Sequence, residues 1–97
     1  MTRRTKDWNE GLAEDLRDPA FAKEFIRALI EDEGFSLQEA LGKTIRAFGI
    51  KEFAVVAEMP ESNVIRAIDP SHNPTQKTLL ELLKPFKLKI SVTDEVA

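Results

Sequence analysis

Residues 48–74, FGIKEFAVVAEMPESNVIRAIDPSHNP, constrain the fold of this chain more than any other stretch. Two short segments with apolar residues at helical spacing, residues 51–58 and 61–69, are separated by only two residues. A third helical pattern, over residues 75–84, follows a loop rich in Pro, Ser and Asn. Two short helices joined by so tight a turn are the physical basis of a helix-turn-helix.

The sequence outside this stretch also predicts helices. Asp18 followed by Pro19 is a strong helix start, because the carboxylate accepts backbone N–H bonds and Pro fits the first turn. Ser36 and Glu39 have the spacing of a capping box that opens the next helix. The expected helix ends are Gly34 and Gly49. We therefore predict an all-α fold, a bundle of about five to six helices.

A short segment near the C-terminus alternates in polarity instead of following a helical period. In residues 87–92, KLKISV, each apolar residue follows a polar one, which predicts a β-strand over residues 88–92. A single strand cannot satisfy its own backbone hydrogen bonds, so it needs a partner. The candidates are the same strand of a second subunit, an edge of another protein, or the N-terminal segment. For a homodimer, the predicted contact residues are Leu88, Ile90 and Val92.

The length and composition favour one compact domain with a modest core, since the chain has 97 residues. We divide it into an N-terminal helical segment (1–35) that would bind a partner or support a dimer, a helix-turn-helix unit (36–92) and a tail (93–97). Cysteine is absent, which excludes disulfides and thiolate metal sites. No apolar run approaches a membrane span and no signal-peptide core is present, so we expect a cytoplasmic protein without a membrane partner.

The net charge of −3 is unusual for a small DNA-binding module, because phosphate neutralisation supplies much of the affinity of such modules. The excess acid is confined to residues 1–35, which hold nine acidic and six basic residues. Residues 36–77 hold five of each sign, and residues 78–97 hold three of each. An acidic segment beside a neutral unit fits a protein that also binds a basic partner and, more commonly, a solvated helical surface.

The second short helix of the tight pair is the candidate reader of double-stranded DNA. A helix-turn-helix projects the first turn of its second helix, where that turn can enter the major groove. We expect Val64, Ile65 and Ile68 to form the buried face of this helix. The side chains left for DNA are Glu61, Ser62, Asn63 and Arg66. Asn can pair with adenine, Ser with several base edges, and Arg with guanine or a phosphate.

Each of these residues also has a simpler interpretation. Ser62 and Asn63 are ordinary polar residues at a helix start. Arg66 could pair with Asp69 or Glu61 on the surface, which would contribute little. Glu61 more commonly complements a helix N-terminus than accepts a hydrogen bond from a cytosine amino group.

The loop and helix start that follow are candidates for contact with the phosphate backbone. Backbone N–H groups at a helix start can bind phosphate, and polar side chains there add donors. The candidates are His72, Asn73, Thr75, Gln76 and Lys77. Lys51 and Lys43 could touch the flanking phosphates. The simpler interpretation is a solvated loop, a capped helix and solvated lysines.

The sequence gives little support for catalysis, a metal or a cofactor. His72 is the single histidine, and with no cysteine a metal site is improbable. A Ser–His–acid triad could be assembled around His72 only on paper, and no Gly-rich phosphate loop is present. We therefore expect neither catalytic residues nor metal ligands nor a cofactor.

Three segments give the chain a resemblance to a known family. They are LRDPAFAKEFIRALIED (16–32), ALGKTIRAFGIKEFAVVAEM (40–59) and NPTQKTLLELLKPFKLKISV (73–92). Their order and spacing resemble the addiction-module antidote family, the antitoxins of host-inhibition-of-growth type toxin–antitoxin pairs. These antitoxins contain a lambda-repressor-like helix-turn-helix domain. The likeness covers most of residues 12–92, although each segment is mainly capping and core chemistry.

The chain departs from the family pattern at the turn and near the last helix. Glu58 stands where the family commonly has Gly, and Pro60 where it usually has a Ser cap. Pro85 and Lys87 replace the family's Ala and Gly. A Glu in a left-handed turn position costs about 1 kcal/mol relative to Gly.

The resemblance implies a prokaryotic transcriptional regulator. Such antitoxins bind a palindromic operator in their own promoter as homodimers, repress it and neutralise a small basic ribonuclease toxin. In that setting Trp8, Phe21 and Phe25, otherwise expected in the core, would form the toxin-docking face. Two alternatives stay open: a helical protein-interaction module of the same fold that has lost DNA binding, and a stand-alone phage-type repressor. Pro60, Glu61 and the neutral helical unit favour the first of these.

Overall fold

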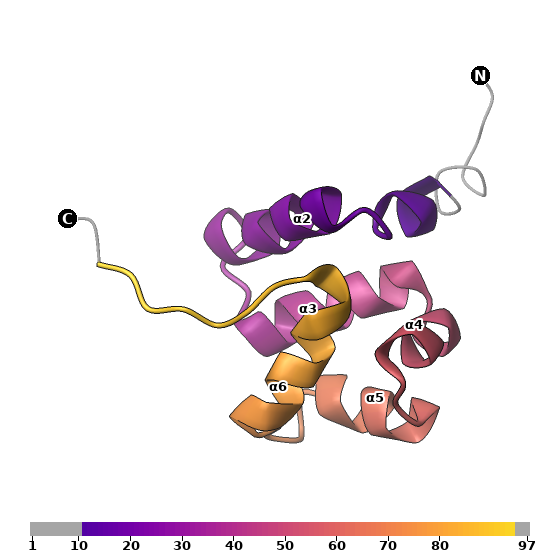
Figure 1. The fold of residues 1–97 in the computed structure, drawn as a ribbon. Coiled ribbons are helices and arrows are strands. Elements are labelled where there is room, and N and C mark those ends of the chain that lie inside the picture. The colour runs from indigo at the N-terminus through magenta and orange to yellow at the C-terminus, as the bar shows by residue number, and fades with distance from the viewer. Residues whose placement is uncertain (1–10, 95–97) are drawn as a thin grey trace.

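Helix α3 (Leu37–Phe48) occupies the centre of the structure and contacts α2, α4, α5 and α6. The computed structural model of the chain describes residues 11–94. Over that range the regular structure is helical throughout, which confirms the predicted all-α fold. In chain order it consists of helical residues 11–15, α2 (Pro19–Glu31), α3, α4 (Ile50–Ala57), α5 (Glu61–Ile68), α6 (Gln76–Leu83) and the 3-10 helix η1 (Lys84–Phe86). In Figure 1, α2 lies along one side of α3, and α4, α5 and α6 lie on the other.

The predicted helix boundaries are confirmed by their capping hydrogen bonds. Asp18 caps α2 by accepting a hydrogen bond from the backbone N–H of Ala20. Ser36 and Glu39 form a complete capping box at the start of α3. The two glycines expected to stop helices have positive φ angles, 78° at Gly34 and 109° at Gly49. These angles suit Gly because it lacks a Cβ atom.

A single hydrophobic core joins α2 to the other helices within residues 11–94. Its aromatic centre is made by Phe48, Phe53 and Phe86, whose ring centroids lie 5.4–6.1 Å apart. Leu16 and Ile26 pack into the same core from the N-terminal segment. Each fully buried aromatic side chain contributes about 1.5–3 kcal/mol. The three rings come from α3, α4 and η1, so their packing fixes the positions of α4 and η1 on α3.

The buried face of α5 differs from the prediction at one position. Val64, Ala67 and Ile68 are buried, whereas Ile65 is 48% exposed. The three buried residues follow the i, i+3, i+4 spacing of one helical face, and Ile65 lies about 100° further round the helix from Val64. The expected inward position of Ile65 was therefore wrong, and Ala67 lies inside in its place.

The predicted β-strand over residues 88–92 is not formed within the described part of the chain. Residues 88–94 have no regular secondary structure. Leu88 is partly buried and its N–H donates a hydrogen bond to the Leu83 carbonyl (3.2 Å), but Val92 is 94% exposed. Residues 11–94 offer this segment no strand edge to pair with, so the alternating pattern alone does not make a strand.

Candidate nucleic-acid interface

Helix α5 and the loop that follows it lie on the side of the bundle away from α2 (Figure 1). The four α5 residues expected to meet DNA are all exposed: Glu61, Ser62, Asn63 and Arg66. Residues 11–33 of the acidic N-terminal segment lie across α3 from this surface and do not cover it. Among the described residues, these four side chains are therefore open to solvent.

The turn between α4 and α5 has Glu58 where a glycine is common, but its backbone has the left-handed conformation that glycine favours. Glu58 has φ 57° and ψ 44°, a left-handed conformation, as expected from its position in the sequence. The N–H of Met59 donates to the Ala54 carbonyl (3.0 Å) and closes α4. Pro60 precedes α5 with an extended backbone and supplies no side-chain cap. The first turn of α5 therefore presents its backbone N–H groups without a capping side chain, beside the carboxylate of Glu61.

Asn63 and Arg66 line a cleft of about 230 Å³ between α5, the following loop and α6. They lie one helical turn apart, and His72 and Asn73 of the loop line the same cleft. Glu81 of α6 adds one carboxylate to it. The fold thus brings together four of the residues predicted to contact DNA, along with an acidic residue that the sequence analysis did not single out.

The other predicted contact residues are exposed but lie outside the lining of this cleft. They are Glu61, Ser62, Thr75, Gln76, Lys77 and Lys51. The Thr75 hydroxyl caps α6 by accepting a hydrogen bond from the N–H of Thr78 (3.2 Å). Lys43 has its ammonium group 4.8 Å from the centre of the Phe35 ring, a cation–π distance. Thr75 and Lys43 therefore each have a structural role.

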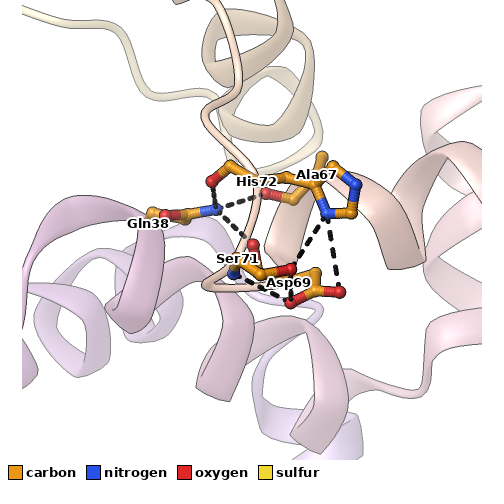
Figure 2. Close-up of polar contacts among 5 residues, drawn as sticks. All are labelled: Gln38, Ala67, Asp69, Ser71 and His72. Carbon is orange, nitrogen blue, oxygen red and sulfur yellow. Dashed lines mark hydrogen bonds and ion pairs between the residues drawn. The ribbon is translucent and has the colours of Figure 1, made fainter.

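Gln38 of α3 holds the end of α5 and the following loop (Figure 2). Its Nε2 group donates to the carbonyl oxygens of Ala67 (2.9 Å), Asp69 (3.0 Å) and His72 (3.1 Å). Three surrounding acceptors require the NH₂ side of the amide, which fixes the orientation of the side chain. Gln38 could not be identified from the sequence, because nothing in a helix sequence ties a polar residue to carbonyl groups 29 to 34 positions away.

Within the loop, Asp69 organises a local turn that includes its neighbours (Figure 2). Its Oδ1 accepts hydrogen bonds from both the N–H and the hydroxyl of Ser71, each at 2.9 Å. Its Oδ2 lies 3.5 Å from Nδ1 of His72. These contacts, led by the Ser71 backbone bond, lower the pKa of the Asp69 carboxyl below its ordinary value despite partial desolvation. Asp69 therefore carries its negative charge within the loop.

Arg66 does not form the surface ion pair that was its simpler interpretation. Neither Asp69 nor Glu61 pairs with it in the described structure, and Asp69 faces His72 instead. The Arg66 guanidinium is therefore not neutralised by either carboxylate.

Apolar side chains are also exposed near this surface. Ile65 stands between Ser62 and Arg66 in the sequence of α5, on the exposed part of the helix. On α4, Val55 is 74% exposed and Val56 is 48% exposed. The signal for Ile65 was available in the sequence, since the i, i+3, i+4 rule already favours Ala67 over Ile65 as the inner residue.

The residues predicted to bind a protein partner are partly described. Phe21 is 39% exposed on α2, and its ring centroid lies 6.3 Å from that of Phe25. Phe25 is partly buried against the core. Trp8 lies outside the described residues. Phe21 is thus available at the surface, and Phe25 packs beneath it against the core.

None of the helices described here is both long enough and apolar enough to cross a membrane. Within residues 11–94, no three His, Asp or Glu side chains gather in a set that could hold a metal ion. Protein-family models, curated proteins and solved structures give no match to this chain. Its function must therefore be inferred from the arrangement of its own residues.

Proposed function

We propose that this protein is a DNA-binding transcriptional regulator in which α4 and α5 form a lambda-repressor-like helix-turn-helix. The observation that carries the proposal is the division of α5 into two faces. Val64, Ala67 and Ile68 are buried, while Ser62 and Arg66 are exposed on a helix at the edge of the bundle. A short helix held in this way can lie in a major groove and present its first two turns to base edges.

The residues on this surface have the chemistry that base and phosphate contacts require. Arg66 can bind guanine or a phosphate, and Asn63 can pair with the edge of adenine. Ile65 offers an apolar contact for the methyl group of thymine. Gln76 and Lys77, in the first turn of α6, are available to the adjacent phosphates.

The distribution of charge supports an approach of DNA from the α5 side. Residues 11–33 hold seven acidic and three basic side chains, a net charge of −4, and they lie across α3 from α5. Residues 61–77 hold two of each sign, with no net charge. The strongest repulsion of phosphate therefore comes from the far side of the protein, where salt screens it most effectively.

We infer further that the regulator acts as a homodimer and as the antitoxin of a toxin–antitoxin pair. Two-fold symmetry would place two copies of α5 about 34 Å apart, one turn of DNA. Residues 88–92 would form the predicted strand on pairing with a second copy, through Leu88, Ile90 and Val92. The acidic N-terminal segment, with Phe21 and Phe25 on α2, would dock a small basic toxin, and binding to its own promoter would make the protein an autorepressor.

A second candidate function, a helical protein-interaction module, is favoured by one observation. Val55 and Val56 expose apolar surface on α4, the helix that would cross the DNA backbone. Single exposed apolar residues are common, but adjacent ones on one helix favour contact with a protein. The absence of a toxin gene beside this one would instead point to a stand-alone repressor.

DNA binding is tested by fluorescence anisotropy with the duplex upstream of the gene and a scrambled duplex of equal length. We expect the upstream duplex to bind at least about 1,000-fold more tightly, with both affinities falling as salt rises. Equal affinity for the two duplexes would contradict sequence-specific regulation and favour the interaction module.

A further inference from the structure

We propose that Gln38 is the positioning residue of the DNA-reading surface: one amide group on α3 sets both the orientation of α5 and the path of the loop at residues 69–73. The contact itself is structural, and its consequence for DNA rests on the proposed function. Gln38 is partly buried and is not among the residues that line the cleft. It therefore acts through its neighbours and need not touch DNA.

The C-terminus of α5 is closed partly by its own chain, since the Asp69 N–H donates to the Arg66 carbonyl (3.3 Å) and the His72 N–H to the Asp69 carbonyl (2.9 Å), and partly by α3. The last carbonyl groups of a helix have no partner within the helix. Helices often close with a left-handed residue, but α5 ends at Asp69, whose backbone is extended (φ −74°, ψ 121°). The carbonyls of Ala67 and Asp69 also accept hydrogen bonds from Gln38. The Ala67 carbonyl is thus bonded by a different helix.

The loop after α5 depends on the same amide group. Its other side-chain hydrogen bonds are local, between Asp69, Ser71 and His72. Within residues 11–94, the three bonds from Gln38 are the only side-chain hydrogen bonds that join residues more than four positions apart. They are therefore the polar connection between this loop and the body of the protein.

The positions that Gln38 holds are adjacent to the predicted contact residues. Ala67 follows Arg66 directly, and His72 precedes Asn73. A shift of either carbonyl would move Arg66 relative to the loop residues across the cleft. Base recognition depends on that spacing, whereas phosphate attraction depends mainly on charge. Loss of Gln38 should therefore reduce specificity more than general affinity for DNA.

The test compares the full-length wild type with Gln38→Met, which keeps the length of the side chain and removes its donors. We expect discrimination between upstream and scrambled DNA to fall about tenfold, the scale of one mismatched base pair. The slope of log affinity against log salt should stay unchanged, because no phosphate contact is lost. Gln38→Lys returns N–H donors to the site, three in place of the two of Gln, so its discrimination should exceed that of Gln38→Met.

Thr44→Val is the matched control on the same helix. The buried Thr44 hydroxyl donates to the Ala40 carbonyl (2.7 Å), so the variant loses a hydrogen bond within α3 alone. We expect it to lower stability while leaving DNA discrimination unchanged. An equal loss of discrimination in Thr44→Val would show that any weakening of α3 suffices, and would overturn the assignment.

A measurement without DNA separates failure of this inference from failure of the proposed function. In ¹⁵N NMR spectra, Gln38→Met should shift the backbone amide signals of residues 66–73 more than those of α2 and α6. If wild type does not discriminate between the two DNAs, the proposed function fails, and these signals alone decide the role of Gln38. Unchanged signals over residues 66–73 would overturn it.

Discussion

Arg66 of α5 and Glu81 of α6 line the same cleft, so the cation expected to meet DNA shares its surface with a carboxylate. A negative charge near the approach path of phosphate weakens binding at any DNA sequence. We predict that Glu81→Gln tightens binding to upstream and scrambled DNA alike, by about 0.5–1 kcal/mol at low salt. Anisotropy titrations at two salt concentrations would measure the effect.

Glu24→Gln is the control for that prediction, since it makes the same change in net charge on α2, the helix that lies across α3 from α5 (Figure 1). It should leave the affinity nearly unchanged, because screening reduces interactions between distant exposed charges. If both variants bind DNA more tightly by the same amount, DNA does not bind at the cleft between α5 and α6.

Ile65 gives a prediction about base preference. Its exposed side chain can pack on a thymine methyl group, so Ile65→Ala should weaken binding only at sites that carry that thymine, by about 1 kcal/mol. The measurement is binding to the upstream duplex with thymine or uracil at each position in turn. Val55→Ala, which also shortens an exposed apolar residue, should leave the pattern unchanged. If Val55→Ala has the larger effect on DNA, α4 and not α5 is the reading helix.

The left-handed conformation of Glu58 predicts a stabilising substitution. Glu58→Gly should raise the free energy of unfolding by about 1 kcal/mol, because Gly adopts φ 57° without a clash of Cβ. Lys87→Gly, at φ 59°, should act in the same direction. Glu52→Gly, at a right-handed position in the first turn of α4, should instead lower the free energy of unfolding, because Gly loses more backbone entropy on folding. Urea unfolding measures the stability of all three variants. A loss of stability in Glu58→Gly would show that Glu58 is not strained at this turn.

Asp69 predicts a dependence of stability on pH. The folded state lowers the pKa of Asp69 from an ordinary value of 3.8, so its stabilising effect is complete above that pH and is lost as the pH falls through the lower, folded-state pKa. Asp69→Asn should therefore be less stable than wild type at about pH 7, and the difference should shrink as the pH falls below 3.8. Thermal unfolding over a series of pH values checks this. Asp94→Asn serves as the control. If wild type remains equally more stable than Asp69→Asn at acid pH, the stabilisation does not come from the charge of Asp69.

Local sequence patterns predicted most of the fold. Asp18, Ser36 and Thr75 cap the helices they were expected to open, because capping involves residues only two or three positions apart. Local patterns could not predict whether residues 88–92 form a strand. An alternating pattern states which residues would share a face, but pairing depends on a second segment that the pattern does not identify.

The candidate site was predictable only where it lies on one helix. The exposure of Ser62, Asn63 and Arg66 follows from the burial of Val64 and Ile68, since helix geometry relates these positions. The meeting of Arg66 with Glu81, and of Gln38 with the loop, depends on how separate helices pack. No local rule in the sequence contains that information.

The most direct test of the account is selection of bound duplexes from a random DNA library by wild type and by Arg66→Ala. If α5 is the reading helix of a dimer, wild type will enrich an inverted repeat whose half-sites lie about 34 Å apart. Arg66→Ala will then lose its preference at one equivalent position in each half-site and keep the rest. No enrichment by wild type, or the same motif from both proteins, would contradict the claim that α5 reads DNA.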